Sequence, residues 1–174
     1  MYKMFDDLVN KIKIICSETR DCDEIYENII NILKSYNPNF LNEIIENEID
    51  FNYENIKIIT VNEDTNPYYK YYLYNSRLFD IIHIKWTKNS ETKIHDNPKL
   101  GCFTFVINDG KLYEHIYTNS YIFKKLLRNA SHKLTYNKIA YINGNINLNK
   151  FCAHEYTETI HICIPGNYRT KYYN

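Results

Sequence analysis

The chain of 174 residues has the length of one domain, and its 21 basic and 21 acidic side chains give a formal net charge of zero. A neutral chain has no general electrostatic attraction to nucleic acid or to an anionic membrane, so neither partner is expected. No apolar run of about 18 residues predicts a transmembrane helix, and the polar, acidic segment 1–7 does not resemble a signal peptide. Five cysteines without a close CxxC pair indicate reduced thiols, which is typical of a cytoplasmic protein.

The first fifty residues predict helices. Apolar residues recur at intervals of three and four from Phe5 to Cys16, and again from Glu24 to Tyr36. Either Asp21 or Asp23 can cap the second helix, because a short acidic side chain accepts hydrogen bonds from the first free backbone N–H groups. A third, short helix is expected from Pro38 to Glu46.

From about Phe51 the pattern changes to short segments rich in β-branched and aromatic residues. The sequence Asn108-Asp109-Gly110 predicts a hairpin turn between two of these segments. Many short strands separated by turns are typical of a sandwich or barrel. We therefore expect a mainly β domain over residues 1–174, with a helical part at 1–50 and a β-barrel body at 51–174. The predicted strands are Ile56–Val61, Tyr69–Tyr74, Leu78–Trp86, Cys102–Ile107, Lys111–Tyr117, Lys138–Ile142, Asn149–Glu155 and Thr159–Pro165.

Two surface features bear on possible partners. The basic run from Lys124 to Arg128 is interpreted as the solvated face of a short helix, and it is too small to predict nucleic-acid binding. The chain also contains 18 tyrosines, a residue favoured at protein interfaces. A homo-oligomeric or partner-binding module is therefore one candidate function.

The most informative spacing joins three residues: His95 follows Trp86 by nine positions, and Cys102 follows His95 by seven. This spacing resembles the central motif of the cysteine dioxygenases, in which a Trp precedes His-Asp-His and a Cys follows. The later stretches Ala140–Asn143 and Ile160–Pro165 also fall in the order of that family. The resemblance extends roughly from Tyr69 to Asn167, and it implies a cupin-type jelly-roll barrel with two or three N-terminal α-helices.

The same resemblance implies a ferrous ion held by three imidazoles, with open positions for substrate and dioxygen. His95 matches the first metal ligand, whereas Asn97 and Asn149 stand where the other two histidines are expected. A carboxamide is a poor ligand for ferrous iron. We therefore expect no bound cofactor, and we expect that the conversion of cysteine to its sulfinic acid is lost.

The other parts of the family site are also altered. In that family an arginine pairs with the substrate carboxylate, and Tyr71 stands at the matching position of this chain. The neighbouring Lys70 is expected to face the other side of the strand. Cys102 matches the crosslinking cysteine, His161 matches the histidine beside the metal site, and Cys163 replaces the crosslinked tyrosine. The two thiols should lie close together, either as buried reduced thiols or as a reversible disulfide. The candidate catalytic positions are therefore Tyr71, Trp86, Cys102, His161 and Cys163.

Three interpretations of this site remain. The preferred one is a catalytically inactive cupin similar to cysteine dioxygenase that binds a small polar molecule or a protein partner. The alternative is an active thiol dioxygenase whose Fe²⁺ is held by His95 together with Asn97, Asn149 or water. A remodelled Zn²⁺ site would instead use His95 and His161 with the two sulfurs.

Overall fold

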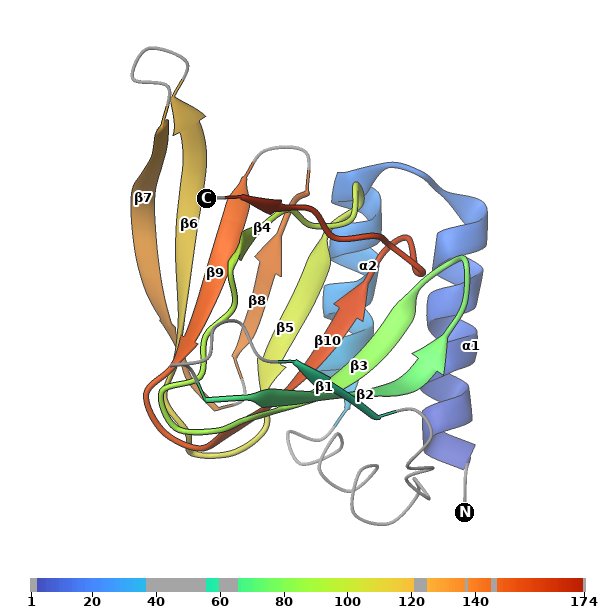
Figure 1. Cartoon of the computed structure of the whole chain (residues 1–174). Helices are drawn as coiled ribbons and strands as arrows, with labels where there is room; N and C mark the ends of the chain where they lie inside the picture. Colours follow the sequence, from blue (N-terminus) through green and yellow to red (C-terminus); the bar gives the residue numbers. More distant parts are fainter. Residues whose placement is uncertain are drawn as a thin grey trace.

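The computed structural model describes residues 3–36, 56–59, 66–120, 125–136, 138–144 and 147–173. Two helices precede a body of antiparallel strands (Figure 1). The elements in chain order are α1 (Lys3–Glu18), α2 (Cys22–Ser35), β1 (Ile56–Ile59), β2 (Tyr68–Asn75), β3 (Asp80–Trp86), β4 (Ile94–His95), β5 (Cys102–Val106), β6 (Leu112–Ser120), β7 (Lys125–Leu134), β8 (Ile139–Ile142), β9 (Leu148–Ala153), β10 (Thr157–Cys163) and β11 (Tyr172–Tyr173).

The first two of the three predicted helices are confirmed. Asp21 is the N-cap of α2, because its Oδ1 accepts the backbone N–H groups of Asp23 and Glu24 at 2.9 and 3.0 Å. The apolar faces of α1 and α2 pack with residues of β3, β5 and β10 in one buried cluster. The third helix, predicted from Pro38 to Glu46, lies outside the described residues.

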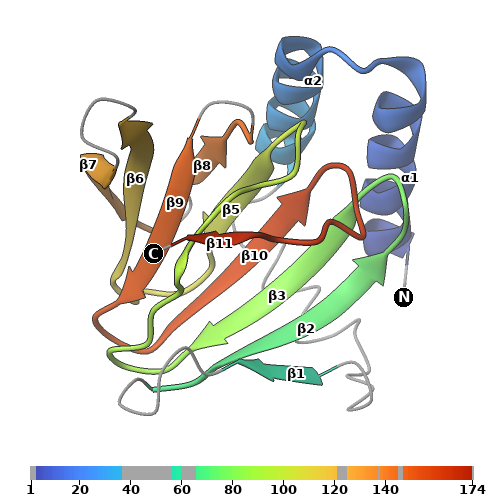
Figure 2. The same ribbon diagram turned by 45° about the horizontal axis from the view of Figure 1, so that its top comes forward.

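The strands form two sheets, in the orders β1-β2-β3-β10-β5-β8 and β11-β4-β9-β6-β7. Figure 2 shows the helices beside the first sheet and the second sheet on the opposite side of the molecule. Side chains from both sheets, among them Tyr68 and Trp86 from the first and Leu112 and Phe151 from the second, meet in a second buried cluster. The molecule therefore has one core between the sheets and another beneath the helices.

Strand β10 separates the two cores. Successive side chains of a strand point to opposite faces, so Ile160 and Ile162 pack in the cluster beneath the helices. Thr159 and His161 point to the other face, toward Trp86. All of these side chains are buried, because β10 is paired with β3 on one side and β5 on the other.

Two sequence predictions about the strands are wrong. Lys125 to Arg128 belong to β7, not to a helix, because this stretch pairs with β6 along its length; Lys124 lies outside the described residues. A turn does form at Asn108, whose Oδ1 accepts the N–H of Gly110 at 3.2 Å. However, the strands it joins are not a hairpin, because β5 and β6 belong to different sheets.

Within the described part of the chain, no helix is long and apolar enough to cross a membrane.

Phe103 provides a test of the packing beneath the helices. Its ring is fully buried, stacks on Tyr26 with a centroid distance of 6.1 Å, and lies tilted against Tyr141 with a centroid distance of 4.8 Å. Phe103→Ala should lower the free energy of unfolding by about 3–5 kcal/mol, because it removes a large buried ring and leaves a cavity. Ile14→Ala, at a side chain 55% exposed on α1, is the matched control. Urea unfolding that showed equal losses for both variants would contradict this packing.

Candidate functional site

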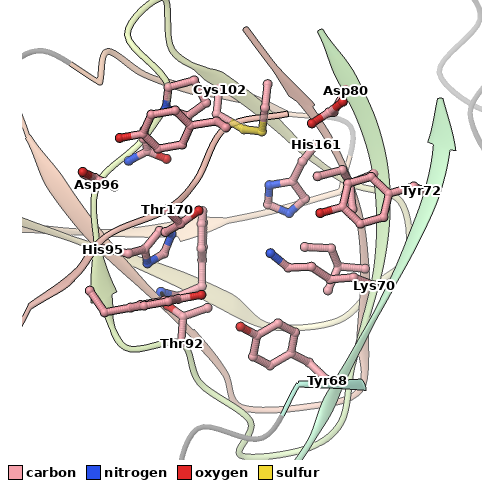
Figure 3. Close-up of a pocket in the computed structure, with 18 of the residues that line it drawn as sticks. Tyr68, Lys70, Tyr72, Asp80, Thr92, His95, Asp96, Cys102, His161 and Thr170 are labelled. Atoms are coloured by element: carbon pink, nitrogen blue, oxygen red, sulfur yellow. Dashed lines mark hydrogen bonds between the residues drawn. A yellow bond between two sulfur atoms is a disulfide. The ribbon is translucent and has the colours of Figure 1, made fainter. Parts of the chain in front are cut away.

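A cavity of about 90 Å³ lies between the inner faces of the two sheets. Its walls come from β2, β3, β5, β9 and β10, from the motif segment at 92–98 and from the C-terminal segment at 168–172 (Figure 3). A cavity of this volume can hold several water molecules or a small organic molecule, since one water needs about 10–15 Å³. Trp86, His95, Asn97, Cys102 and His161 line it, so much of the motif read from the sequence converges here.

The three positions expected for metal ligands are adjacent in space. His95 and Asn149 are directly opposed in the pairing of β4 with β9. The amide of Asn97 donates to Oδ1 of Asn149 at 3.0 Å, and the amide of Asn149 donates to Oε1 of Glu114 at 2.8 Å. All three side chains of this chain of hydrogen bonds are buried. The amide N–H groups of both asparagines therefore donate to side-chain acceptors of the protein.

Glu114 was not predicted from the sequence, where it is one glutamate in an ordinary strand. Burial raises the pKa of its carboxyl group, and the hydrogen bond from Asn149 acts in the opposite direction. The alternation of Leu112, Glu114 and Ile116 along β6 was the available signal, because it places Glu114 on an apolar face.

His95 is neutral at physiological pH. Burial lowers its pKa to about 4, and the nearby Lys70 acts in the same direction. Its Nδ1 lies 2.8 Å from the carbonyl oxygen of Lys93, which can only accept, so Nδ1 carries the proton. Nε2 of the neutral ring then carries a lone pair.

His161 is held by two threonines. Its Nδ1 lies 3.1 Å from Oγ1 of Thr104, and its Nε2 lies 2.9 Å from Oγ1 of Thr159. Thr159 also accepts the indole N–H of Trp86 at 2.8 Å. Burial lowers the pKa of His161 to about 3, so the ring is neutral with both nitrogens occupied.

The placement of Lys70 and Tyr71 reverses the expectation from the sequence. Lys70 lines the pocket, and its ammonium group points into it near Tyr68 and His161 (Figure 3). Tyr71 lies on the outer face of β2 and stacks on His83, with ring centroids 5.5 Å apart. Neighbouring residues of a strand point to opposite faces, so Lys70 faces the pocket and Tyr71 does not. Tyr71 therefore does not contact the pocket.

Cys102 and Cys163 lie close together, as predicted, but they are not the reduced thiols that the cysteine content indicated. They are directly opposed in the pairing of β5 with β10, with Cα atoms 4.2 Å apart, and their sulfurs form a disulfide on the pocket wall. A disulfide sulfur is not a thiolate, so in this state the pair does not supply the ligands of the zinc alternative.

The C-terminal segment contributes three wall residues that were not predicted: Tyr168, Thr170 and Tyr172. Two aspartates attach this segment to the barrel. Asp80 accepts the N–H of Asn167 at 2.8 Å, and Asp96 accepts the N–H of Lys171 at 2.8 Å. The spacing of two between the wall residues was a strand-like signal, because alternate residues of an extended chain share a face.

The side chains present do not fit the ferrous ion of the resembled family. Only His95 supplies an imidazole at the three ligand positions, and the other two side chains are hydrogen-bonded amides. Across the described ranges, no group of three His, Cys, Asp or Glu side chains could hold a metal ion.

No protein-family model matches the sequence, and no curated protein matches it. Solved structures do match the fold. A cupin-like protein from Thermotoga maritima is similar with a TM-score of 0.50 and 12% identity, over 68% of this chain and 86% of that chain. The EutQ protein of Clostridium difficile is similar with a TM-score of 0.50 and 10% identity, over 69% of this chain and 83% of that chain. This chain therefore has the cupin fold. It is similar to these structures, and it consists of two N-terminal helices and two antiparallel sheets.

Proposed function

We propose that this chain is an iron-independent cupin, similar to the cysteine dioxygenases in its motif, that binds a small anionic molecule in the barrel pocket. The hydrogen-bonded chain of Asn97, Asn149 and Glu114 carries the proposal. A metal site needs lone pairs directed at one empty point, whereas the amide of Asn97 donates to Asn149 and the amide of Asn149 donates to Glu114. The buried amide N–H groups therefore have hydrogen-bond acceptors in the protein without a bound ion.

His161 supports a binding function over a catalytic one. A general acid or base needs a pKa near the operating pH and contact with the reacting group. The pKa of His161 lies near 3, and both nitrogens are engaged by threonine hydroxyls. His161 then serves to position Thr159 and, through it, Trp86.

Lys70 indicates the charge of the ligand. Among the described residues that line the pocket, it is the only lysine or arginine. The carboxylates of Asp80 and Asp96 also line the pocket, but they accept backbone N–H groups of the C-terminal segment. A carboxylate or similar small anion can receive a charge-assisted hydrogen bond from Lys70, while Trp86 and Phe151 contact its apolar part.

Metal analysis tests whether the protein is independent of iron. Protein purified from iron-supplemented medium should hold far less than one iron, zinc or nickel atom per chain. The double variant Asn97→His, Asn149→His should gain ferrous iron, because it restores three imidazoles around one point.

Asn129→His, at an exposed position on β7, is the matched control for an added histidine. Near-stoichiometric iron in the unmodified protein would contradict the proposal, and it would favour the alternative of an active thiol dioxygenase.

The variant Lys70→Met tests whether the pocket binds a small anion through Lys70. NMR titration with propionate should show binding that perturbs pocket residues, and the variant should weaken it by about tenfold or more, because a charge-assisted hydrogen bond contributes about 1.5–3 kcal/mol. Lys85→Met is the control, since Lys85 lies over the ring of Tyr71 on the outer face. Equal affinities in Lys70→Met and the unmodified protein would exclude Lys70 as the anion partner.

The neutral state of His161 predicts a loss of stability in acid. Its folded pKa of about 3 lies below the usual value of 6.5, so the unfolded chain binds the extra proton as pH falls below 6.5. This residue alone should lower the free energy of unfolding by about 2 kcal/mol between pH 7 and pH 5. His161→Gln should show a shallower pH slope by that amount, and Asn129→Gln, which replaces an exposed side chain without removing a titratable group, should not. Identical slopes in all three proteins would show that His161 is not a buried neutral group.

A further inference from the structure

The disulfide between Cys102 and Cys163 is the one covalent crosslink in the pocket wall. Cys102 belongs to β5 and Cys163 to β10, and the two residues are opposed at one end of the paired segment. Cys102 is only 5% exposed, while Cys163 is half-buried, so Cys163 is the more exposed residue of the pair, and both line the pocket. A small reagent that enters the pocket can therefore reach this pair.

The strands do not depend on the crosslink for their register. β5 and β10 are paired at five positions, and β10 is also paired with β3 at seven. The helices pack on the outer face of the same strands, through Phe103, Ile160 and Ile162. Opening the disulfide should leave this framework folded.

Opening the disulfide must nevertheless change the pocket. Bonded sulfurs lie about 2.05 Å apart, whereas two thiols must separate to roughly 3.5 Å or more. Because Cys102 is tightly enclosed, part of this movement must be taken up on the pocket side. The cavity holds only about 90 Å³, so a displaced sulfur changes the space available to a ligand.

We propose that Cys102 and Cys163 form a reversible redox switch that sets the ligand affinity of the pocket. The inference rests on the proposed ligand-binding function, and it adds regulation of the same site. The oxidant is a low-molecular-weight disulfide, RSSR. The Cys163 thiol loses its proton and attacks RSSR, which forms a mixed disulfide and releases one RSH. The Cys102 thiol then loses its proton and displaces the second RSH, so two thiols and RSSR become one protein disulfide and two RSH.

The remaining cysteines are placed differently. Cys16 is buried in the cluster beneath the helices, and burial raises the pKa of its thiol to about 11. Cys152 lies beside Glu91, and burial raises the pKa of its thiol to about 11 as well. Cys22 and these two residues are free thiols. None of the three lines the pocket.

The experiment equilibrates the folded protein in glutathione buffers of graded thiol-to-disulfide ratio. After rapid alkylation, mass spectrometry should show one reversible transition from three to five free thiols, located at Cys102 and Cys163. The only tryptophan, Trp86, lines the pocket, so its fluorescence should follow the same transition. Propionate affinity should fall by about fivefold or more on reduction.

Cys163→Ala should abolish the fluorescence transition, and Cys152→Ser, outside the pocket, should retain it. Five free thiols at every ratio would overturn the proposal, as would a disulfide that stays closed at every ratio. A thiol transition with unchanged Trp86 emission and unchanged propionate affinity would also overturn it. If propionate binds neither state while both other signals change, the anion proposal fails and the redox response of the pocket stands.

Discussion

Strand β10 is hydrogen-bonded to β3 on one side and to β5 on the other, and it lies inside the first sheet with the helices on one face and the pocket on the other. A strand buried on both faces must supply two different surfaces from alternate residues. Here Ile160 and Ile162 pack beneath the helices, while Thr159, His161 and Cys163 face the barrel interior. One short segment therefore holds the helices in place and builds one wall of the pocket.

The polar interior of the barrel is organised by hydrogen bonds between its own side chains. Asn97, Asn149 and Glu114 form one chain, and Trp86, Thr159, His161 and Thr104 form another. Buried polar groups are costly unless they are paired. The side chains at the metal-ligand positions of the resembled family are therefore held in the interior by hydrogen bonds to protein groups, without an ion. Lys70 lies beside these two networks, and its charge is the reason for the proposed anionic ligand.

The sequence predicted the features that depend on local periodicity. Helical spacing predicted α1 and α2, and Asp21 was one of the two acidic residues predicted to cap α2. The motif from Trp86 to Cys102 identified residues that line one pocket. Features that depend on long-range pairing were not predicted. The run from Lys125 to Arg128 is a strand only because β6 lies beside it, and the turn at Asn108 does not reveal that its strands separate into different sheets. Lys70, and not Tyr71, faces the pocket. Neighbouring residues of a strand point to opposite faces, and the sequence alone does not show which of the two faces the interior.

The proposed pocket retains the cupin frame without the oxygen chemistry of the resembled family. Oxygen uptake checks this with purified protein supplied with ferrous iron and L-cysteine under air. A pocket without this chemistry should give the same oxygen consumption as buffer with iron and cysteine alone, and no sulfinate in the product mixture. Sustained, protein-dependent oxygen consumption that yields cysteine sulfinate, and that is lost in His95→Ala, would contradict it.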